Sequence, residues 1–376
     1  MSERFDVAVV GAGILGLAHA LAASRCGLKV IVIDREAEAI GASVRNFGFI
    51  TVTGQQAGEC WRRAMRSRDV WLDVAPKAGI IIEQEGLLVT AQRPEAMAVL
   101  EAFADTEMGA ECSLLAPQEV RRRGQGAFAD GPLAGGLWSP HERRVESRDA
   151  IRRFAAWLES EGVTFRRQTL VRGIVPGRVE TSAGPIAAER IIACPGDDLL
   201  TLFPETIARL GITRCRLHML KVDPGDPDFR LPGAVMSDLS LVRYLGYSEL
   251  PEAAALRARI EAEQPEHLAN GIHLIVVQGA DGGLIVGDSH HYAWSPSPFN
   301  VAVVDDLILQ EMQAVLTLSK ARVTERWVGT YASLPDRLMV REAPDASIRL
   351  VVVTSGTGAS TSFAIAEETI DELFAG

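Results

Sequence analysis

Three glycines near the N-terminus have the spacing of a turn that binds a dinucleotide. Gly11, Gly13 and Gly16 follow the apolar run Phe5–Val10 and open a helix that we expect over Ile14–Cys26. Glycine allows a sharp turn at the first position, close approach of a pyrophosphate at the second, and close packing of helix on strand at the third. Because free N–H groups at the start of a helix attract phosphate, this pattern predicts a bound dinucleotide.

An acidic residue at the end of the next apolar strand supports the same prediction. Residues 28–33 form that strand, and Asp34 follows it, where a carboxylate can accept both hydroxyls of a ribose. Arg35 comes next in the chain. The guanidinium of Arg35 can lie over an adenine ring. An arginine at this position also keeps an NAD(P) reductase as an alternative.

Two later segments favour FAD over a nicotinamide cofactor. Residues 349–374 have the pattern of a strand, the turn TSGTGAS and a helix, and the loop GASVRNFG spans residues 41–48. A simple nicotinamide-binding domain needs no such return at its C-terminal end. A protein that stretches FAD across its sheet must hold the flavin with something other than the first helix, so we expect FAD.

With these motifs the chain resembles the D-amino acid oxidase/glycine oxidase/sarcosine oxidase superfamily of FAD-dependent oxidoreductases. The resemblance covers nearly the whole length and includes GAGILG, ESRDAIRRFAAWLESEGVTF, RIIACPG and TSGTGAS. It implies an α/β fold with an FAD-binding Rossmann-like βαβ domain and an antiparallel-sheet substrate domain, as in glycine oxidase. The segments SVRNFGF, GDSHHY and GTYASLPD are most similar to a branch associated with bacterial aminoalkylphosphonate catabolism.

The resemblance also implies cofactor-binding positions beyond Gly11, Gly13, Gly16, Asp34 and Arg35. These further positions are Ile14, Leu15, Ser43, Arg45, Asn46, Phe47, Gly48, Val171, Ala193, Gly196, Gly356, Thr357 and Gly358. In the family pattern the loop around Ser43 meets the pyrophosphate and flavin, and the backbone at Val171 meets the adenine. The turn at Gly356 would cap the N1/C2 edge of the flavin, where reduction places negative charge that a helix N-terminus stabilises.

The predicted cofactor domain is discontinuous. We expect it to comprise residues 1–73, 146–215 and 327–376, and the substrate domain to comprise residues 74–145 and 216–326. In the substrate domain GIIIEQEGLLVTA predicts a hairpin, and HMLKVD, LVRYLGY, IHLIVVQ and GLIVGDS predict strands. The turn Gly279–Gly283 joins the last two strands, and apolar spacing predicts a helix over residues 298–318.

The candidate substrate-binding residues form a small set. In the amino acid oxidase relatives an arginine in a GLRP segment clamps the substrate carboxylate, whereas here GTYA places Tyr331 at that position. The other candidates are His290, His291, Arg243 and Tyr244. The two histidines would point to opposite faces of a strand, so one of them at most faces a pocket. The sequence also allows that Tyr331 only packs at a domain interface. Arg243 could equally be a solvated charge at the edge of a sheet.

By this reasoning we expect an enzyme that oxidises the C–N bond of a small primary or secondary amine. The resemblance implies hydride transfer to flavin N5 followed by imine hydrolysis, with an aminoalkylphosphonate such as N-methylated 2-aminoethylphosphonate as substrate. The alternatives are a glycine, sarcosine or D-amino acid oxidase, an FAD-dependent 2-hydroxy acid dehydrogenase, and a non-catalytic flavoprotein. Oxygen or another electron acceptor would complete the reaction.

The formal net charge of −11 argues against nucleic acid and anionic membrane surfaces as partners. No apolar stretch outside the N-terminal cofactor motif reaches the length of a membrane span. The five cysteines lack metal-ligand spacing, so we expect no metal and a reduced, cytoplasmic setting.

Overall fold

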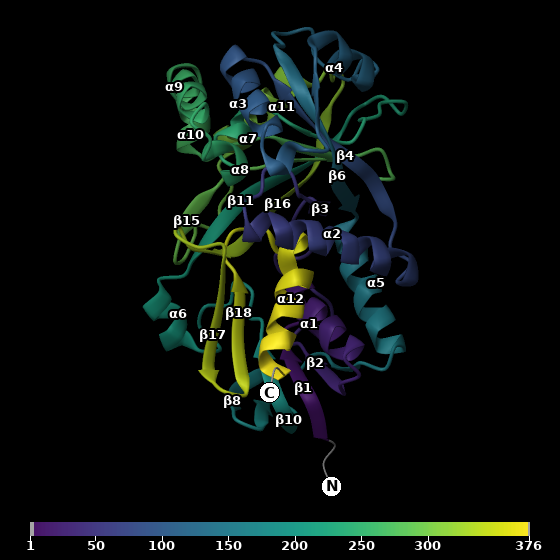
Figure 1. Cartoon of the computed structure of the whole chain (residues 1–376), viewed down its shortest axis with the longest axis vertical. Coiled ribbons are helices and arrows are strands. Elements are labelled where there is room, and N and C mark those ends of the chain that lie inside the picture. Colours follow the sequence, from purple (N-terminus) through teal and green to yellow (C-terminus); the bar gives the residue numbers. More distant parts are fainter. Residues whose placement is uncertain (1–3, 375–376) are drawn as a thin grey trace.

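The computed structural model describes residues 4–374 and contains two β-sheets joined through several crossing segments (Figure 1). The first sheet has the order β17-β18-β10-β1-β2-β7, with β9 paired to β10 and β8 to β9. Its strands are β1 (Arg4–Val10), β2 (Val30–Ile33), β7 (Thr164–Arg166), β8 (Val171–Val175), β9 (Arg178–Thr181), β10 (Gly184–Ala193), β17 (Met339–Asp345) and β18 (Ile348–Val353). The central strands β18, β10, β1, β2 and β7 are parallel.

Helices cover one face of this sheet. They are α1 (Ile14–Arg25), α2 (Glu59–Lys77), α5 (Ser147–Ser160) and α12 (Gly358–Phe374). In Figure 1 the yellow α12 lies beside the purple α1, so the two ends of the chain share one layer. Val7 and Val9 of β1 face these helices, whereas Ala8 and Val10 face the side of β8, β9 and α6 (Pro204–Leu210). A parallel sheet covered on both faces explains why its strands are continuously apolar.

The second sheet is almost entirely antiparallel and has the order β15-β11-β14-β13-β12-β4-β6-β3, with β16 on β11 and β5 on β6. Its strands are β3 (Phe49–Ile50), β4 (Ile82–Ala91), β5 (Ser113–Leu115), β6 (Gly135–Val145), β11 (Thr213–Asp223), β12 (Ala234–Met236), β13 (Ile275–Gln278), β14 (Leu284–Gly287), β15 (His291–Ala293) and β16 (Arg322–Ser333). The helices associated with it are α3 (Pro94–Ala104), the short η1 (Glu107–Gly109), α4 (Pro117–Gly124), α7 (Asp238–Leu241), α8 (Leu245–Ser248), α9 (Ala253–Glu263), α10 (Pro265–Ala269) and α11 (Ala302–Val315). The fold class expected from the sequence is confirmed.

Several local predictions are confirmed and two are wrong. The first βαβ unit, the C-terminal strand-turn-helix, the β13–β14 hairpin and the helix within residues 298–318 are all present. The segment GIIIEQEGLLVTA is no hairpin, because β4 continues through Gly86 as one strand with a bulge against β6. The segment LVRYLGY is no strand: the hydroxyl of Ser240 bonds to the Leu274 carbonyl, and the chain turns through α7 and α8.

The proposed domain division crosses two long strands. The boundaries at 215/216 and 326/327 fall inside β11 and β16, which pair with each other from Thr213 and Ser333 onward. These two strands therefore extend from the substrate sheet toward the cofactor side. Within the described part of the chain, no helix is long and apolar enough to cross a membrane.

A buried histidine in α1 makes the fold sensitive to acid. His19 is fully buried, and its Nδ1 lies 2.7 Å from the Leu15 carbonyl. Burial lowers the pKa of His19 from 6.5 to about 4; the Leu15 hydrogen bond opposes that shift and the charge of Arg341 adds to it. Because the folded-state pKa is depressed, stability present above pH 6.5 is lost as the pH falls toward 4.

We therefore predict that the His19→Leu variant loses less stability on acidification than the parent protein. The difference in the free energy of unfolding between pH 7 and pH 5 should be about 2 kcal/mol smaller in the variant. Urea unfolding at both pH values measures it, and Leu17→Met, a buried change in the same helix, should retain the parent's pH dependence. An equal loss in His19→Leu would contradict this prediction.

Candidate functional site

One cavity of about 850 Å³ joins the first glycine turn to the second sheet. It is lined at one end by Gly13 and Ser43, along its length by Gly356 and Tyr331, and at the far end by Arg243. These residues come from the N-terminal, middle and C-terminal parts of the chain. The cavity is therefore long, and it lies where the two sheets meet.

The three glycines of the first turn are required by close contacts. Gly11 has φ +107°, and a Cβ on it would lie 2.4 Å from the Cys194 carbonyl oxygen. A Cβ on Gly16 would lie 1.8 Å from the carbonyl oxygen of Gly11, so α1 can pack on β1 only with glycine there. A Cβ on Gly13 would lie 2.9 Å from Ser43 Oγ and would point into the space at the helix start. The turn is thus a cradle open to a phosphate-bearing ligand.

Asp34 holds this turn rather than lining the cavity. One carboxylate oxygen accepts the Ala12 N–H at 2.6 Å, and the other accepts the Glu36 N–H at 2.8 Å. Each oxygen retains a lone pair for a ribose hydroxyl. Arg35 lies outside the cavity lining and donates to Asp198 at 2.7 Å. Val171 is buried on β8, two residues after Thr169 in the sequence. The N–H of Thr169 donates to the Asp34 carbonyl.

The loop of residues 41–48 closes over the start of α1. The Ser43 hydroxyl accepts the Ile14 N–H at 3.0 Å. The Asn46 side chain holds the loop itself, donating to the Ala42 carbonyl and accepting the Gly48 N–H, both at 2.7 Å. Gly48 has φ +67° and lies against the Val145 carbonyl, outside the cavity.

The remaining members of the predicted cofactor set lie around this loop and the first turn. Ile14, Leu15, Arg45, Asn46, Phe47 and Gly196 line the cavity, whereas Ala193 is buried at the end of β10. The Arg45 side chain has no hydrogen bond or ion pair within residues 4–374, so its guanidinium is free to meet a ligand anion.

The closing turn brings the start of α12 to the middle of the cavity. Gly356 has φ +74°, and a Cβ on it would lie 3.1 Å from Cζ of Tyr331. Thr357 accepts the N–H groups of Ser360 and Thr361 through its carbonyl, which starts α12 at Gly358. The first N–H groups of a helix have no partner within the helix, so this turn offers donors next to the Tyr331 ring.

The far end of the cavity holds one arginine among phenols. Arg243 Nη2 donates to the hydroxyl of Tyr292 at 2.9 Å, and Tyr244 and Tyr331 line the same space. Burial alone would lower the pKa of Arg243, but Tyr331, Tyr292 and Asp288 outweigh it and the net shift is upward. Burial holds the phenol pKa of Tyr331 well above its usual range. The site therefore presents a fixed cation and neutral hydroxyl donors.

His290 faces this cavity and His291 does not. His290 is 8% exposed and its Nδ1 lies 2.9 Å from the Gly271 carbonyl, whereas Nε2 of His291 contacts Asn270 at 3.2 Å. Burial and the charge of Arg243 hold the pKa of His290 well below its usual range, although Asp288 opposes the shift. As expected, one of the two histidines at most faces the cavity, and that residue is His290.

Sequence reasoning missed two residues of this end, Tyr292 and His273. Tyr292 follows the two histidines in the segment GDSHHY, and its hydroxyl accepts a hydrogen bond from Arg243. His273 precedes β13, and its N–H and carbonyl bond to the backbone of Asp288 after β14. The predicted hairpin turn at Gly279–Gly283 was the available signal, since counting outward from it brings residue 273 close to residue 288.

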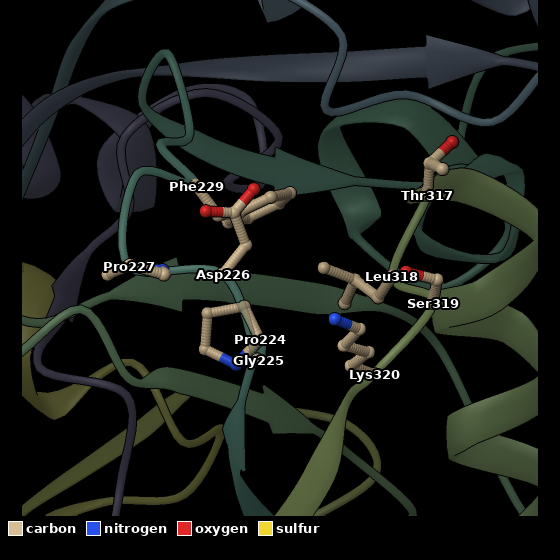
Figure 2. Close-up of a pocket in the computed structure, with 9 residues that line it drawn as sticks. All are labelled: Pro224, Gly225, Asp226, Pro227, Phe229, Thr317, Leu318, Ser319 and Lys320. Carbon is tan, nitrogen blue, oxygen red and sulfur yellow. The ribbon is translucent and has the colours of Figure 1, made fainter.

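A second cavity lies elsewhere, at the far end of β11 (Figure 2). It measures about 320 Å³ and is lined by residues 224–227, 229 and 317–320. Figure 2 shows Asp226 and Lys320 as its charged side chains. None of the predicted site residues lies there, so the chemistry belongs to the larger cavity.

The fold and the large cavity define a class of protein. A two-domain dinucleotide-dependent oxidoreductase has three such parts. They are a Rossmann-like sheet with a glycine cradle at one helix start, a second helix start along the same cavity, and an antiparallel sheet that closes the far end. FAD fits the residues present, because glycines line both helix starts and leave room for an extended ligand between them.

The chain belongs to the family of FAD dependent oxidoreductases named DAO, whose model matches residues 6–372. It is therefore an FAD-dependent enzyme. It is 26% identical over 204 residues to monomeric sarcosine oxidase of Bacillus sp. (strain B-0618), a match that spans 52% of each protein.

Two solved structures share the fold at lower identity. Glycine oxidase from Geobacillus kaustophilus is 17% identical, with a TM-score of 0.78 over 99% of this chain and 95% of that one. L-proline dehydrogenase from P. horikoshii is also 17% identical, with a TM-score of 0.80 over 100% and 95%. These likenesses confirm the fold expected from the sequence.

We predict that Ser43→Ala weakens cofactor binding without preventing folding. The change removes the oxygen that accepts the Ile14 N–H, and loss of such a cap costs about 1 kcal/mol. The dissociation constant for FAD, measured by flavin fluorescence on reconstitution, should rise about 5-fold. Ser24→Ala at the other end of α1 is the matched control and should leave it unchanged; equal constants in all three proteins would contradict the prediction.

Proposed function

We propose that this enzyme oxidises the C–N bond of a small anionic amine, and that its substrate is an aminoalkylphosphonate such as N-methylated 2-aminoethylphosphonate. The observation that supports this most directly is Arg243, a permanent cation that lines the cavity beside Tyr292 and Tyr331. An anion held there directs the rest of a small substrate toward the closing turn. The names of the relatives, sarcosine oxidase and glycine oxidase, agree with an amine as substrate.

Arg243 and two phenols offer several donors to an anion. The bond from Nη2 of Arg243 to Tyr292 uses one of the five N–H groups of the guanidinium, so the others remain for a ligand. Tyr292 accepts that bond and keeps its own O–H for a ligand, and Tyr331 supplies a second hydroxyl from β16. Three donors from different directions fit the three oxygens of a phosphonate.

We propose the predicted cofactor residues as the FAD site. Ser43 and the first glycine turn would meet the pyrophosphate, Asp34 the ribose, and the Gly356–Gly358 turn the flavin edge. When bound, FAD supplies the acceptor for the two electrons of the C–N oxidation. The protein's part is to fix the amine carbon between Tyr331 and the closing turn, and to keep bulk water from that position.

We also propose cytoplasmic location, oxygen or another small acceptor as partner, and the two-part domain division given above. A 2-hydroxy acid dehydrogenase on the same fold is the second candidate, since Arg243 would hold the anionic end of such a substrate as well.

Anaerobic loss of the flavin absorbance on mixing with a substrate panel tests the proposal. N-methyl-2-aminoethylphosphonate and 2-aminoethylphosphonate should reduce the flavin with a second-order rate constant about 100-fold above that for sarcosine, glycine or D-alanine. Sarcosine reacting as fast as the phosphonates would remove the substrate assignment. Lactate reacting faster than every amine would move the reaction to a C–O bond, and no reduction by any compound would favour a non-catalytic flavoprotein.

A further inference from the structure

Three ligand-type side chains meet at the wall of the large cavity. His273, Asp288 and His290 are each at least nine-tenths buried, and their ligating atoms all lie within 4.8 Å of one another. Nε2 of His273 lies 2.8 Å from Asp288 Oδ1, and Nε2 of His290 lies 3.8 Å from Asp288 Oδ2. All three residues line the cavity beside Arg243.

The Nδ1 atoms of both rings contact neighbouring polar groups, and the Nε2 atoms lie on the side of Asp288. His290 Nδ1 contacts the Gly271 carbonyl, which can only accept, so Nδ1 carries the hydrogen and Nε2 carries the lone pair. Nδ1 of His273 lies 3.3 Å from the hydroxyl of Ser240, which donates to the Leu274 carbonyl. The Nε2 atoms of both rings therefore face Asp288.

This arrangement leaves a buried carboxylate oxygen without a hydrogen bond of good geometry. Asp288 Oδ1 accepts no hydrogen bond from residues 4–374 although Nε2 of His273 is 2.8 Å away. A buried carboxylate oxygen without a hydrogen bond is costly, and a cation beside it would offset that cost. A histidine that binds a metal through one ring nitrogen usually has its other ring nitrogen hydrogen-bonded to a neighbouring group, such as a backbone carbonyl.

We propose that His273, Asp288 and His290 bind a divalent transition-metal cation of the Zn²⁺ class at the substrate end of the cavity. Two imidazoles and one carboxylate suit such a cation, and three protein ligands leave a coordination position open to the cavity. A divalent cation beside Asp288 and Arg243 gives a net positive site. A dianion neutralises it, so the open position takes an oxygen of the substrate's anionic group; this role rests on the function proposed above.

Zn²⁺ binding to the FAD-loaded protein, measured by calorimetry and by metal content after dialysis, tests the site without turnover. We expect about one Zn²⁺ per chain, and at least about 100-fold weaker binding in Asp288→Asn and His273→Gln. His291→Gln, which alters the neighbouring histidine outside the cluster, should bind Zn²⁺ like the parent. Flavin absorbance and far-UV circular dichroism identify which variants are folded, and His290→Gln replaces either one that is not.

A second titration tests the role of the cation. Methylphosphonate, which has the anion but no amine, should tighten Zn²⁺ binding about 10-fold, because two ligands that meet in one site are coupled. Unchanged Zn²⁺ affinity would overturn the anchoring role. Absence of Zn²⁺ binding, or equal binding by the parent and the cluster variants, would overturn the metal site. Zn²⁺ binding by a protein whose flavin no amine reduces would instead remove only the proposed function.

Discussion

Replacing Arg243 by Met should lower kcat/KM for an anionic amine about 100- to 1000-fold, mainly through KM. Removing the cation that pairs with a bound anion costs about 3–4 kcal/mol. Arg243 is partly exposed and lines the cavity with Tyr244, Tyr292 and Tyr331, and none of these neutral phenols can replace its charge. FAD content should be unchanged, because the partner of the Arg243 side chain is Tyr292 and not a residue of the first turn. Steady-state kinetics and the ratio of flavin to protein absorbance measure both quantities.

Two variants make this result specific. Arg243→Lys keeps the charge and loses the planar fork, so its kcat/KM should lie between the parent and Arg243→Met. Arg337→Met is the matched control, because Arg337 is half exposed and, among residues 4–374, its side chain bonds only to Asp336. Kinetics of Arg243→Met equal to those of Arg337→Met would show that the anion is held elsewhere.

Gly16→Ala should abolish FAD binding by the purified protein. The added Cβ would lie 1.8 Å from the backbone oxygen of Gly11, and backbone cannot move aside as a side chain can. The start of α1 must then shift away from β1, and the N–H groups that meet the pyrophosphate shift with it. We expect an FAD affinity lower by more than about 100-fold, measured by the flavin content after purification and by reconstitution with FAD.

Gly13→Ala separates cofactor loss from misfolding. Among the described residues its Cβ would contact only Ser43, whose Oγ lies at 2.9 Å, so the protein should fold while the added methyl group occupies the phosphate cradle. Gly173→Ala on β8 is the control, since no atom of the described chain lies within 4 Å of the added Cβ and the backbone there is ordinary. Stoichiometric FAD in both Gly16→Ala and Gly13→Ala would contradict the assignment of this turn.

The parts of the fold that the sequence predicted are those set by neighbouring residues. Glycine spacing and an apolar strand on each side define the first βαβ unit, and TSGTGAS between a strand and a helix defines the closing turn. The Gly279–Gly283 turn defined the β13–β14 hairpin for the same reason. Each of these signals lies within a short stretch of chain.

The errors arose where distant contacts decide the local conformation. β4 has a glycine that looks like a turn, but pairing with β6 along its length keeps it one strand. The residues around Arg243 look like a strand, yet the chain is helical at Gly246, where a Cβ would lie 2.4 Å from the Gln55 carbonyl oxygen. The cluster of His273 with Asp288 depends on a hairpin register that composition does not reveal.

A crystal structure of the FAD-bound protein tests the central claim most directly, that one cavity holds the whole cofactor and the substrate's anion. We expect the pyrophosphate at Gly13 and Ser43, the N1/C2 edge of the flavin at Gly356–Gly358, and one flavin face turned toward Arg243. A flavin ring that binds away from the closing turn and does not face Arg243 would contradict the account.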